Sequence, residues 1–368
     1  MVWKPANRSR SFDKHVARKI VRNINENVEV LIKDSKLIDE KYYEKDEHLG
    51  LFKKNELKLG EMLGSGGFSD VYEIRGFNFS SEDKISSRKI SRRQILKEQA
   101  IDYNGCSKFV VKCLKSKLAK DTSKFESAAA DLIVEAQLLS NLNHENVLSV
   151  WGWASMGAFA YSSGDHDAYF LVLDRVYDTL DKRIEKWRSI ENDDLRIPTQ
   201  ILQQVALGLK YLHSKNVVFR DVKPENIGFD KDGKVKIFDF GLARELPNKK
   251  FNVSDLYHMT GKVGTLRYMA PECAISKQYN QKVDSYSWGL LFWNCLVLDR
   301  PYEGMSRSDH RQQVCFRKER PQLDDSWPES IKNLLQKSWA HSLRARYTMS
   351  KICTDMEQIH AELIEDQT

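Results

Sequence analysis

A chain of 368 residues, of which 41% are hydrophobic and 30% are charged, has the composition of a globular protein with a large buried core. At roughly 150 residues per domain, this length predicts about two domains. The 58 basic and 52 acidic residues give a net charge of +6. This mild excess is compatible with an anionic partner such as a nucleotide or with unpaired surface lysines, and it does not require a nucleic acid.

The six cysteines predict free thiols in a reducing compartment. They form no CxxC pair and no Cys/His cluster with zinc-ligand spacing, and they stand at positions 106, 113, 273, 295, 315 and 353. The basic start lacks the apolar core of a signal peptide, and Asp13 and the acid-rich stretch from Glu26 weaken the alternative of a transit peptide. Because no apolar run approaches the roughly 20 residues that span a bilayer, we expect a cytoplasmic protein without a transmembrane segment, with the nucleus as a second compartment.

Residues 1–52 are expected to form an N-terminal extension. The segment is polar and rich in charge, and its apolar pattern is short: Val28, Val30, Leu31, Leu37 and Ile38. That pattern is compatible with one helix or one strand. We interpret the extension as partly disordered, docked on the main body, and a candidate for a regulatory role.

The residues from Leu57 predict two strands around a turn. The stretch LKLGEMLGSGGFSDVYEI alternates apolar and polar residues on both sides of a glycine cluster. Residues 76–108 then interrupt the pattern with a basic, weakly helical segment. We interpret it as an insertion between two strands, and as a solvated loop in preference to a surface for a partner, an acidic substrate or a membrane.

Further along the chain, predicted strands give way to predicted helices. Strands are expected at 109–114, 168–176 and 235–238, and helices at 128–142, 288–298, 328–340 and 348–364. Another helix has the apolar face Ile201, Val205, Leu209 and Leu212. Because 288–298 is apolar on all sides, this helix should be fully buried. The layout is α+β, with a small strand-rich lobe and a larger helical lobe that join near Asp174.

The glycine cluster is a candidate phosphate-binding loop. It runs Gly64-Ser65-Gly66-Gly67-Phe68-Ser69-Asp70-Val71 between the two predicted strands. Glycines let backbone N–H groups approach a phosphate chain with no side chain in the way. Taken alone, the segment is equally well explained as an ordinary glycine-rich hairpin turn.

A lysine in an apolar strand is the second candidate. Lys112 is flanked by Val110, Val111 and Leu114, where a charge is costly unless it is paired. Glu135 on the following helix is a suitable partner, and the pair would hold an ammonium against two phosphates. The alternative is an exposed lysine on an edge strand.

A compact polar loop follows the helix that ends near Leu212. In it, Asp221 is followed two residues later by Lys223 and five residues later by Asn226. Asp239-Phe240-Gly241 stands directly after the strand predicted at 235–238. The oxygens of Asn226 and Asp239 would suit Mg²⁺, which takes few protein ligands together with phosphates. A turn would explain Asp-Phe-Gly alone, but it does not explain the ordered combination.

These features together resemble the signature series of the eukaryotic protein kinases, in order and in spacing. The residues that carry the resemblance are Gly64–Val71, Lys112, Glu135, Arg220, Asp221, Asn226, Asp239-Phe240-Gly241 and Ala270-Pro271-Glu272. The resemblance covers roughly residues 57–360. It implies a bilobal kinase domain at 53–362, with a small antiparallel sheet and one helix at 53–173 and a larger, mostly helical lobe at 177–362.

The resemblance implies ATP and Mg²⁺ as cofactors and a protein as substrate. The loop at 64–71 would cover the ATP phosphates, and the cofactor-binding residues in and beside it would be Leu63, Gly64, Ser65, Gly66, Gly67, Phe68 and Val71. Lys112, paired with Glu135, would orient the α- and β-phosphates, and Asn226 and Asp239 would hold Mg²⁺. Asp221 would accept or align the proton of the substrate hydroxyl.

The same resemblance implies an adenine pocket. Val110 would lie above the adenine and Leu173 behind its pocket. Asp174-Arg175-Val176 matches the hinge, whose backbone would bond the adenine. Two structural contacts are also implied, because Glu272 should pair with Arg346, and Asp284 resembles the residue that anchors the catalytic loop.

Two positions resemble serine/threonine kinases and not tyrosine kinases. Lys223 would contact the γ-phosphate, and the Thr265 hydroxyl, which follows Gly264, would bridge to Asp221 and Lys223. The stretches SYSWGLLFWNCLVLDRPYEGM and SWAHSLRARYTM resemble the tyrosine-kinase-like branch of these kinases.

Arg220, immediately before Asp221, implies regulation by a phosphate on the activation loop. The loop runs from Asp239 to Glu272, and its candidate acceptors are Ser254, Tyr257 and Thr260, of which we favour Thr260. An upstream activating kinase would then be a partner. The alternative is a loop that is never modified.

Three positions depart from the family pattern. Ser69 replaces the third glycine, which many active kinases tolerate. Val110 replaces an alanine and would tighten the adenine pocket. Phe219 replaces the histidine of the catalytic loop and would preserve its packing in a stack with Phe240.

An active serine/threonine kinase is favoured over a pseudokinase scaffold, because the five polar catalytic positions are intact. Lys223 and Thr265 argue against a tyrosine or dual-specificity kinase. The basic residues 84–97 lack the interleaved aromatic side chains of a nucleic-acid binder, so no nucleic-acid partner is expected. The sequence predicts no particular oligomeric state.

Overall fold

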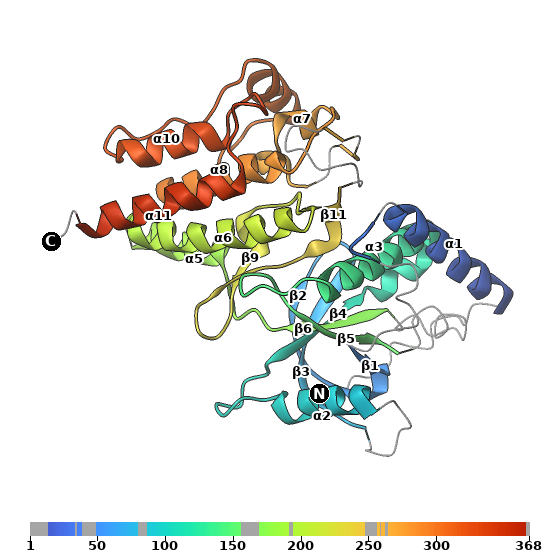
Figure 1. Ribbon diagram of the computed structural model, residues 1–368. Coiled ribbons are helices and arrows are strands. Elements are labelled where there is room, and N and C mark those ends of the chain that lie inside the picture. Colours follow the sequence, from blue (N-terminus) through green and yellow to red (C-terminus); the bar gives the residue numbers. More distant parts are fainter. Residues whose placement is uncertain are drawn as a thin grey trace. The chain divides into compact units, whose positions relative to one another are not determined.

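The chain divides into two compact units in a computed structural model (Figure 1). The first unit is Met1–Asn143 with Leu148–Arg175, and the second is His144–Val147 with Val176–Thr368. The structure describes residues 14–33, 35–38, 49–79, 87–155, 169–190, 194–246, 256–257, 259–261 and 264–365. One unit is built on a sheet and the other mainly on helices, which confirms the predicted α+β class.

The first unit is a sheet with three described helices. Its strands are β1 (Gly50–Phe52), β2 (Leu57–Ser65), β3 (Ser69–Phe77), β4 (Phe109–Leu114), β5 (Val150–Ala154) and β6 (Phe170–Asp174), and its helices are α1 (Lys14–Ile32), α2 (Ser87–Gln99) and α3 (Thr122–Ser140). The six described strands are ordered β1-β5-β6-β4-β3-β2. Neighbouring strands are antiparallel, except that β1 pairs in parallel with β5.

This sheet is covered on both faces. Side chains alternate between the faces along β4, so Lys112 and Val111 point to opposite sides. Helix α3 lies on the Lys112 side, because its Glu135 binds that lysine. Val111 lies on the other side, in a buried cluster that includes Leu96 of α2. Strands that are buried on both faces read as continuous apolar runs, as β4 and β6 do.

Helix α2 shows that the interpretation of 76–108 as a solvated loop is wrong for its second half. β3 continues to Phe77, and Leu96 and Ala100 are buried against the sheet. The part at 80–86 lies outside the described residues.

A buried ion pair explains how a basic segment enters the core. Arg93 of α2 donates to a carboxylate oxygen of Glu56 at 2.7 Å, and both side chains are buried. Its guanidinium also lies 4.2 Å from the centre of the Phe79 ring. Because the charge is neutralised in place, the arginine can be buried among apolar residues.

The N-terminal segment contains a helix, α1, which is longer than the apolar pattern suggested. Its buried residues form a stripe at three- and four-residue spacing: Ala17, Ile20, Ile24, Val28 and Ile32. The helix packs along α3, as the docking interpretation expected (Figure 1). Val30 is 76% exposed and Leu31 is 39% exposed, so two residues of the predicted pattern face solvent. Residues 1–13 and 39–48 of the predicted extension lie outside the described residues.

The second unit consists mainly of helices. These are α5 (Leu180–Ser189), α6 (Arg196–Ser214), α7 (Pro271–Ala274), α8 (Lys282–Val297), α9 (Arg307–His310), α10 (Glu329–Ser338) and α11 (Met349–Glu365). Its described strands form two small antiparallel sheets from β7 (Asp178–Thr179), β8 (Val217–Val218), β9 (Ile227–Phe229), β10 (Val235–Ile237) and β11 (Arg244–Glu245). The sheets are ordered β10-β9-β7 and β11-β8.

Helix α8 is the centre of this unit. Every residue from Val283 to Cys295 is buried, as expected for a helix that is apolar on all sides. Helices α6 and α10 pack against it, and α11 packs against α6. The indole N–H of Trp288 donates to the Leu202 carbonyl of α6 at 3.0 Å, which satisfies a polar group in the core.

Candidate active site

The glycine-rich turn lies in register with the strand lysine. Gly64 of β2 pairs with Val71 of β3, and Val71 pairs with Lys112 of β4. Residues directly opposite each other on neighbouring strands share a face of the sheet. The hairpin and the lysine are therefore presented together on the face that α3 covers.

The tip of the hairpin is held by its own hydrogen bonds. The Gly66 N–H donates to the Ser69 carbonyl at 2.8 Å, and the Ser65 hydroxyl donates to Asp70 at 2.7 Å. A side chain at Gly64 or at Gly67 would meet no other atom within 4 Å. The turn therefore leaves open space beside its backbone, as a phosphate-binding loop requires. The side chains of Leu63 and Phe68 are exposed.

Lys112 and Glu135 form the predicted ion pair. The ammonium donates to both carboxylate oxygens of Glu135 at 2.8 Å. The side chains are 13% and 3% exposed, so each charge needs the other. This arrangement keeps an ammonium on a nearly buried strand, at the position where the resemblance places the ATP phosphates.

The predicted adenine-pocket residues of the first unit are also aligned. Val110 of β4 pairs directly with Leu173 of β6, and both are buried. The N–H groups of Asp174 and Arg175 already donate to the carbonyls of Ser149 and Lys108 at 3.1 and 2.9 Å. These two hinge N–H groups are therefore engaged within the protein.

Val176, the last of the predicted hinge residues, belongs to the second unit. A side chain added at Gly228 of β9 would lie 2.3 Å from a methyl carbon of Val176, so the valine packs on the bare glycine backbone. This close approach requires glycine at that position.

Asp284 holds the polar loop of the second unit in place. Its fully buried carboxylate accepts hydrogen bonds from the backbone N–H groups of Phe219 and Arg220 at 2.9 and 2.8 Å. His213 contacts the same carboxylate at 2.9 Å. Arg220 has a φ of 69°, a conformation that costs a non-glycine residue energy and that these bonds stabilise. The anchoring contact that the resemblance implied is present.

Asp221 lies at the centre of a fully engaged polar network. One carboxylate oxygen accepts from the backbone N–H and the hydroxyl of Thr265 at 2.9 and 3.1 Å. The other accepts from Asn226 at 2.9 Å and lies 2.7 Å from the Lys223 ammonium. Lys223 also donates to the Thr265 hydroxyl at 3.1 Å, so the predicted threonine bridge is present. A carboxylate held in this way is fixed in orientation before any substrate arrives.

Asn226 and Asp239 are brought close by the β9–β10 hairpin. The Phe238 N–H, next to Asp239 in the chain, donates to the Asn226 carbonyl at 3.1 Å. The amide nitrogen of Asn226 donates to the Asp221 carbonyl and carboxylate, both at 2.9 Å, which leaves its side-chain oxygen as the acceptor. One amide oxygen and one carboxylate form a donor set that fits Mg²⁺. Among the described residues, no cluster of three or more His, Cys, Asp or Glu side chains forms a separate metal site.

The favoured acceptor Thr260 touches the arginine of the catalytic loop. Arg220 donates to the Thr260 hydroxyl at 2.9 Å, to the Tyr279 hydroxyl at 3.2 Å and to the Leu242 carbonyl at 2.7 Å. Burial raises the pKa of Tyr279, so its hydroxyl stays protonated and donates to the Thr260 carbonyl at 2.9 Å. Spacing did not predict Tyr279, because 59 residues separate it from Arg220 in the sequence.

The two other predicted acceptors differ from Thr260. Ser254 lies outside the described residues. Tyr257 is buried, and its backbone exchanges hydrogen bonds with that of Tyr279 at 2.9 and 3.2 Å. The Thr260 hydroxyl, by contrast, accepts a hydrogen bond from Arg220.

Two predicted packing contacts support the loop. Glu272 and Arg346 form a buried ion pair with two hydrogen bonds, at 2.6 and 3.1 Å. The Phe219 and Phe240 rings meet edge to face at 5.1 Å between centres, so the phenylalanine that replaces histidine keeps the expected packing.

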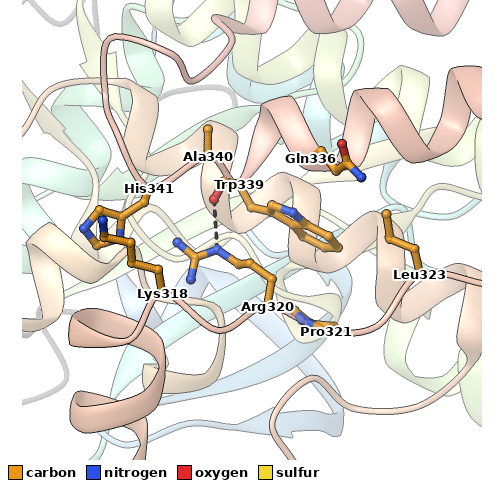
Figure 2. Close-up of a pocket in the computed structure, with 8 residues that line it drawn as sticks. All are labelled: Lys318, Arg320, Pro321, Leu323, Gln336, Trp339, Ala340 and His341. Atoms are coloured by element: carbon orange, nitrogen blue, oxygen red, sulfur yellow. Dashed lines mark hydrogen bonds between the residues drawn. The ribbon is translucent and has the colours of Figure 1, made fainter.

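A pocket of about 290 Å³ lies elsewhere in the second unit (Figure 2). It is lined by Lys318, Arg320, Pro321, Leu323, Gln336, Trp339, Ala340 and His341. None of the predicted site residues lines it. Arg320 donates to the Trp339 carbonyl at 2.9 Å within this lining, so its guanidinium is used to join two segments of the unit.

Comparison with known proteins identifies the family. The family model of the protein kinase domain matches residues 97–356. Serine/threonine-protein kinase STY46 of Arabidopsis thaliana is 26% identical over 84% of this chain and 45% of its own length. A dual specificity protein kinase of Dictyostelium discoideum, shkE, is 27% identical over 66% of this chain and 32% of its own length. An Aurora kinase of Schizosaccharomyces pombe is 27% identical over 70% and 58%, respectively.

The chain spans less than two thirds of the length of each of these relatives. In the part of the chain that the structure describes, no helix has the length and apolar character needed to cross a membrane.

Proposed function

This chain belongs to the protein kinase family, and we propose that it transfers the γ-phosphate of ATP to serine and threonine hydroxyls of protein substrates. The observation that carries the proposal is the network around Asp221. Both oxygens of this carboxylate are held by Thr265, Asn226 and Lys223. Phosphoryl transfer asks the protein mainly for positioning and charge neutralisation, and a pre-oriented carboxylate beside an ammonium supplies both.

The roles follow from the contacts of each residue. Asp221 accepts or aligns the proton of the attacking hydroxyl. Lys223, 2.7 Å from that carboxylate, stabilises negative charge on the transferred phosphoryl group. Asn226 and Asp239 would hold Mg²⁺, which supplies further neutralisation of the phosphate charge when it is bound.

The first unit supplies the nucleotide-binding residues in this proposal. The open backbone of the 64–67 turn would receive the phosphates, and Lys112, fixed by Glu135, would bind the α- and β-phosphates. Val110 and Leu173 would border the adenine. Because the N–H groups of Asp174 and Arg175 are engaged, the hinge would contact adenine through the Asp174 carbonyl and through Val176.

Serine/threonine specificity is supported by Lys223 and Thr265, which share a hydrogen bond and both contact Asp221. Of the relatives above, STY46 is named a serine/threonine-protein kinase, whereas shkE is named a dual specificity protein kinase. We propose serine/threonine specificity and treat transfer to tyrosine as an outcome to be tested.

We also propose that phosphorylation of Thr260 regulates the transfer. The Thr260 hydroxyl already accepts a hydrogen bond from Arg220. A phosphate at that oxygen would place nearly two negative charges against the guanidinium and order the segment next to Asp221. An upstream activating kinase, or a second copy of this chain, would add the phosphate.

The state of the cysteines supports a proposal for the cellular compartment. All six cysteines are free thiols, and four of them are buried. Free thiols fit a reducing compartment, so we propose the cytoplasm, with the nucleus as a second compartment.

A transfer assay tests the main proposal. Wild-type chain, Asp221→Asn, Asp239→Ala and the surface control Asp325→Asn are incubated with Mg²⁺, γ-labelled ATP and a basic substrate protein. We expect transfer by wild type and by Asp325→Asn, and loss of transfer in the other two variants. Phosphoamino-acid analysis then separates serine and threonine from tyrosine. ATP binding without transfer, even after treatment with an activating kinase, would indicate a pseudokinase scaffold and refute the proposal.

The regulatory proposal is tested on the same substrate. Thr260→Ala should remove activation by treatment with an upstream kinase, whereas Thr260→Ser, which keeps a hydroxyl for the phosphate, should retain it. Mass mapping should find phosphate at residue 260 in the activated wild type. Equal activation of the alanine variant would exclude Thr260 as the regulatory acceptor.

A further inference from the structure

Helix α3 is held from two opposite sides. Nine positions separate Glu126 from Glu135, and nine steps of about 100° bring the second residue to the far side of the helix. Glu135 binds Lys112 of β4, whereas Glu126 accepts a hydrogen bond from the Asn23 amide of α1 at 2.9 Å. The helix that carries Glu135 therefore has the sheet on one side and α1 on the other.

The side of α3 that faces α1 carries apolar side chains, two of which are small alanines. Ala129, Ala130 and Ile133 lie three, four and seven residues after Glu126, on the same helix face, and all three are buried. Small side chains allow two helices to approach closely. The buried side of α1, which packs along α3, is the stripe that runs from Ala17 to Ile32.

The extensive burial of α3 requires that α1 pack against it in addition to the sheet. Its residues from Ala128 to Leu139 are buried, with the sole exception of Asp131, so this part of the helix has almost no solvent-facing side. A helix that is buried on several sides needs more than one packing partner. The sheet accounts for the Glu135 side, and α1 is the main described element on the opposite side.

Helix α1 lies outside the part of the chain that the family model matches. The matching family model begins at residue 97, whereas α1 ends at Ile32. The contact between α1 and α3 therefore involves a helix outside the matched part of the chain.

We propose that α1 is a positioning helix for the nucleotide site. By covering the Glu126 face of α3, it holds Glu135 within hydrogen-bond distance of Lys112 and so sets the affinity for ATP. Loss of the α1 contact lets α3 move away from the sheet, and the ammonium then loses the carboxylate that orients it. The effect on transfer rate rests on the proposed function, but the effect on nucleotide affinity is measured without any chemistry.

The test compares two lysine substitutions on the same helix in the full chain. Ile24→Lys places a charge in the fully buried stripe, and Val30→Lys places the same charge at a position that is 76% exposed. The Kd for a non-hydrolysable ATP analogue with Mg²⁺ is measured by titration calorimetry. We expect Ile24→Lys to weaken binding about tenfold and Val30→Lys to change it by less than about twofold. Ile24→Val, which conserves the apolar contact, should bind like wild type.

A double-mutant cycle separates positioning from a general loss of structure. If α1 acts through Glu135, Ile24→Lys should have little further effect on Kd once Glu135→Gln has removed the ion pair. Multiplying effects would overturn the proposal, as would wild-type affinity in Ile24→Lys. If the lysine variant fails to fold, judged by its thermal transition, Ile24→Ala enters the same cycle. A wild type that binds the analogue but transfers no phosphate would refute the proposed function, and the Kd comparison would still decide the role of α1.

Discussion

Removing the Asp284 carboxylate should destabilise the catalytic loop. In Asp284→Ala, the buried N–H groups of Phe219 and Arg220 lose the carboxylate oxygens that accept their hydrogen bonds at 2.9 and 2.8 Å. An unsatisfied buried N–H costs about 1–3 kcal/mol, so the two together predict a loss of about 2–6 kcal/mol in the free energy of unfolding. Asp284→Asn keeps one acceptor oxygen and should lose about half as much. Urea unfolding followed by tryptophan fluorescence measures both variants, with the exposed Asp325→Ala as control.

The same change should lower catalysis, because the bonds to Asp284 stabilise the left-handed conformation of Arg220 next to Asp221. A displacement of about 1 Å in a catalytic group can cost about a hundredfold in rate, so kcat should fall by roughly that factor in Asp284→Ala. Stability within about 0.5 kcal/mol of the Asp325→Ala control would refute the reasoning, since that is the range of ordinary surface substitutions.

Three further changes test other parts of the second unit. Arg346→Met leaves the Glu272 carboxylate buried without its ion pair and should destabilise the fold by about 3–5 kcal/mol in urea unfolding, and adding Glu272→Leu should recover most of the loss. Gly264→Ala places a side chain at a φ of 95°, with its Cβ 2.5 Å from the Arg220 carbonyl oxygen. We therefore expect kcat to fall about tenfold or more while the Kd for ATP stays unchanged. An unaltered kcat would contradict this expectation. Burial, with neighbouring arginines, lowers the pKa of His310 to about 4 from an ordinary value of 6.5, so the unfolded chain takes up a proton that the folded chain does not between these values. The free energy of unfolding should therefore fall by up to about 3 kcal/mol as the pH falls from 6.5 to 4. In His310→Phe, the free energy of unfolding should depend less on pH over this range. An equally steep pH dependence in the variant would count against a buried neutral histidine.

The parts of the fold that sequence patterns predicted are those with a local origin. Alternating residues around a glycine cluster specify the β2–β3 hairpin, and an apolar run places Lys112 in a strand. The spacing of Asp221, Lys223 and Asn226 is short enough that one loop must bring them together. For these residues, chain neighbours decide the geometry, and the structure has the contacts that were expected among them.

The parts that were missed depend on distant partners. A basic segment indicates solvent when it is read alone, yet Arg93 is buried because Glu56, 37 residues earlier, neutralises it. The buried stripe of α1 was likewise not predicted from the charge-rich N-terminal segment, because its burial depends on the alanines of α3. Tyr279 contacts Arg220 although 59 residues separate them in the sequence. Patterns with a period of two or 3.6 residues carry no information about such pairs.

The parallel pairing of β1 with β5 affects how this protein can be shortened. β1 covers the edge of β5 through the pairs Gly50↔Gly152, Leu51↔Trp153 and Phe52↔Ala154. The strands meet closely, since a side chain at Gly152 would lie 2.5 Å from the Gly50 carbonyl oxygen. A chain that starts at residue 53, where the signature resemblance places the domain, would lack this strand and expose unpaired N–H and C=O groups along β5. Free sheet edges pair with other copies, so such a truncated chain should aggregate more readily than the chain that keeps β1.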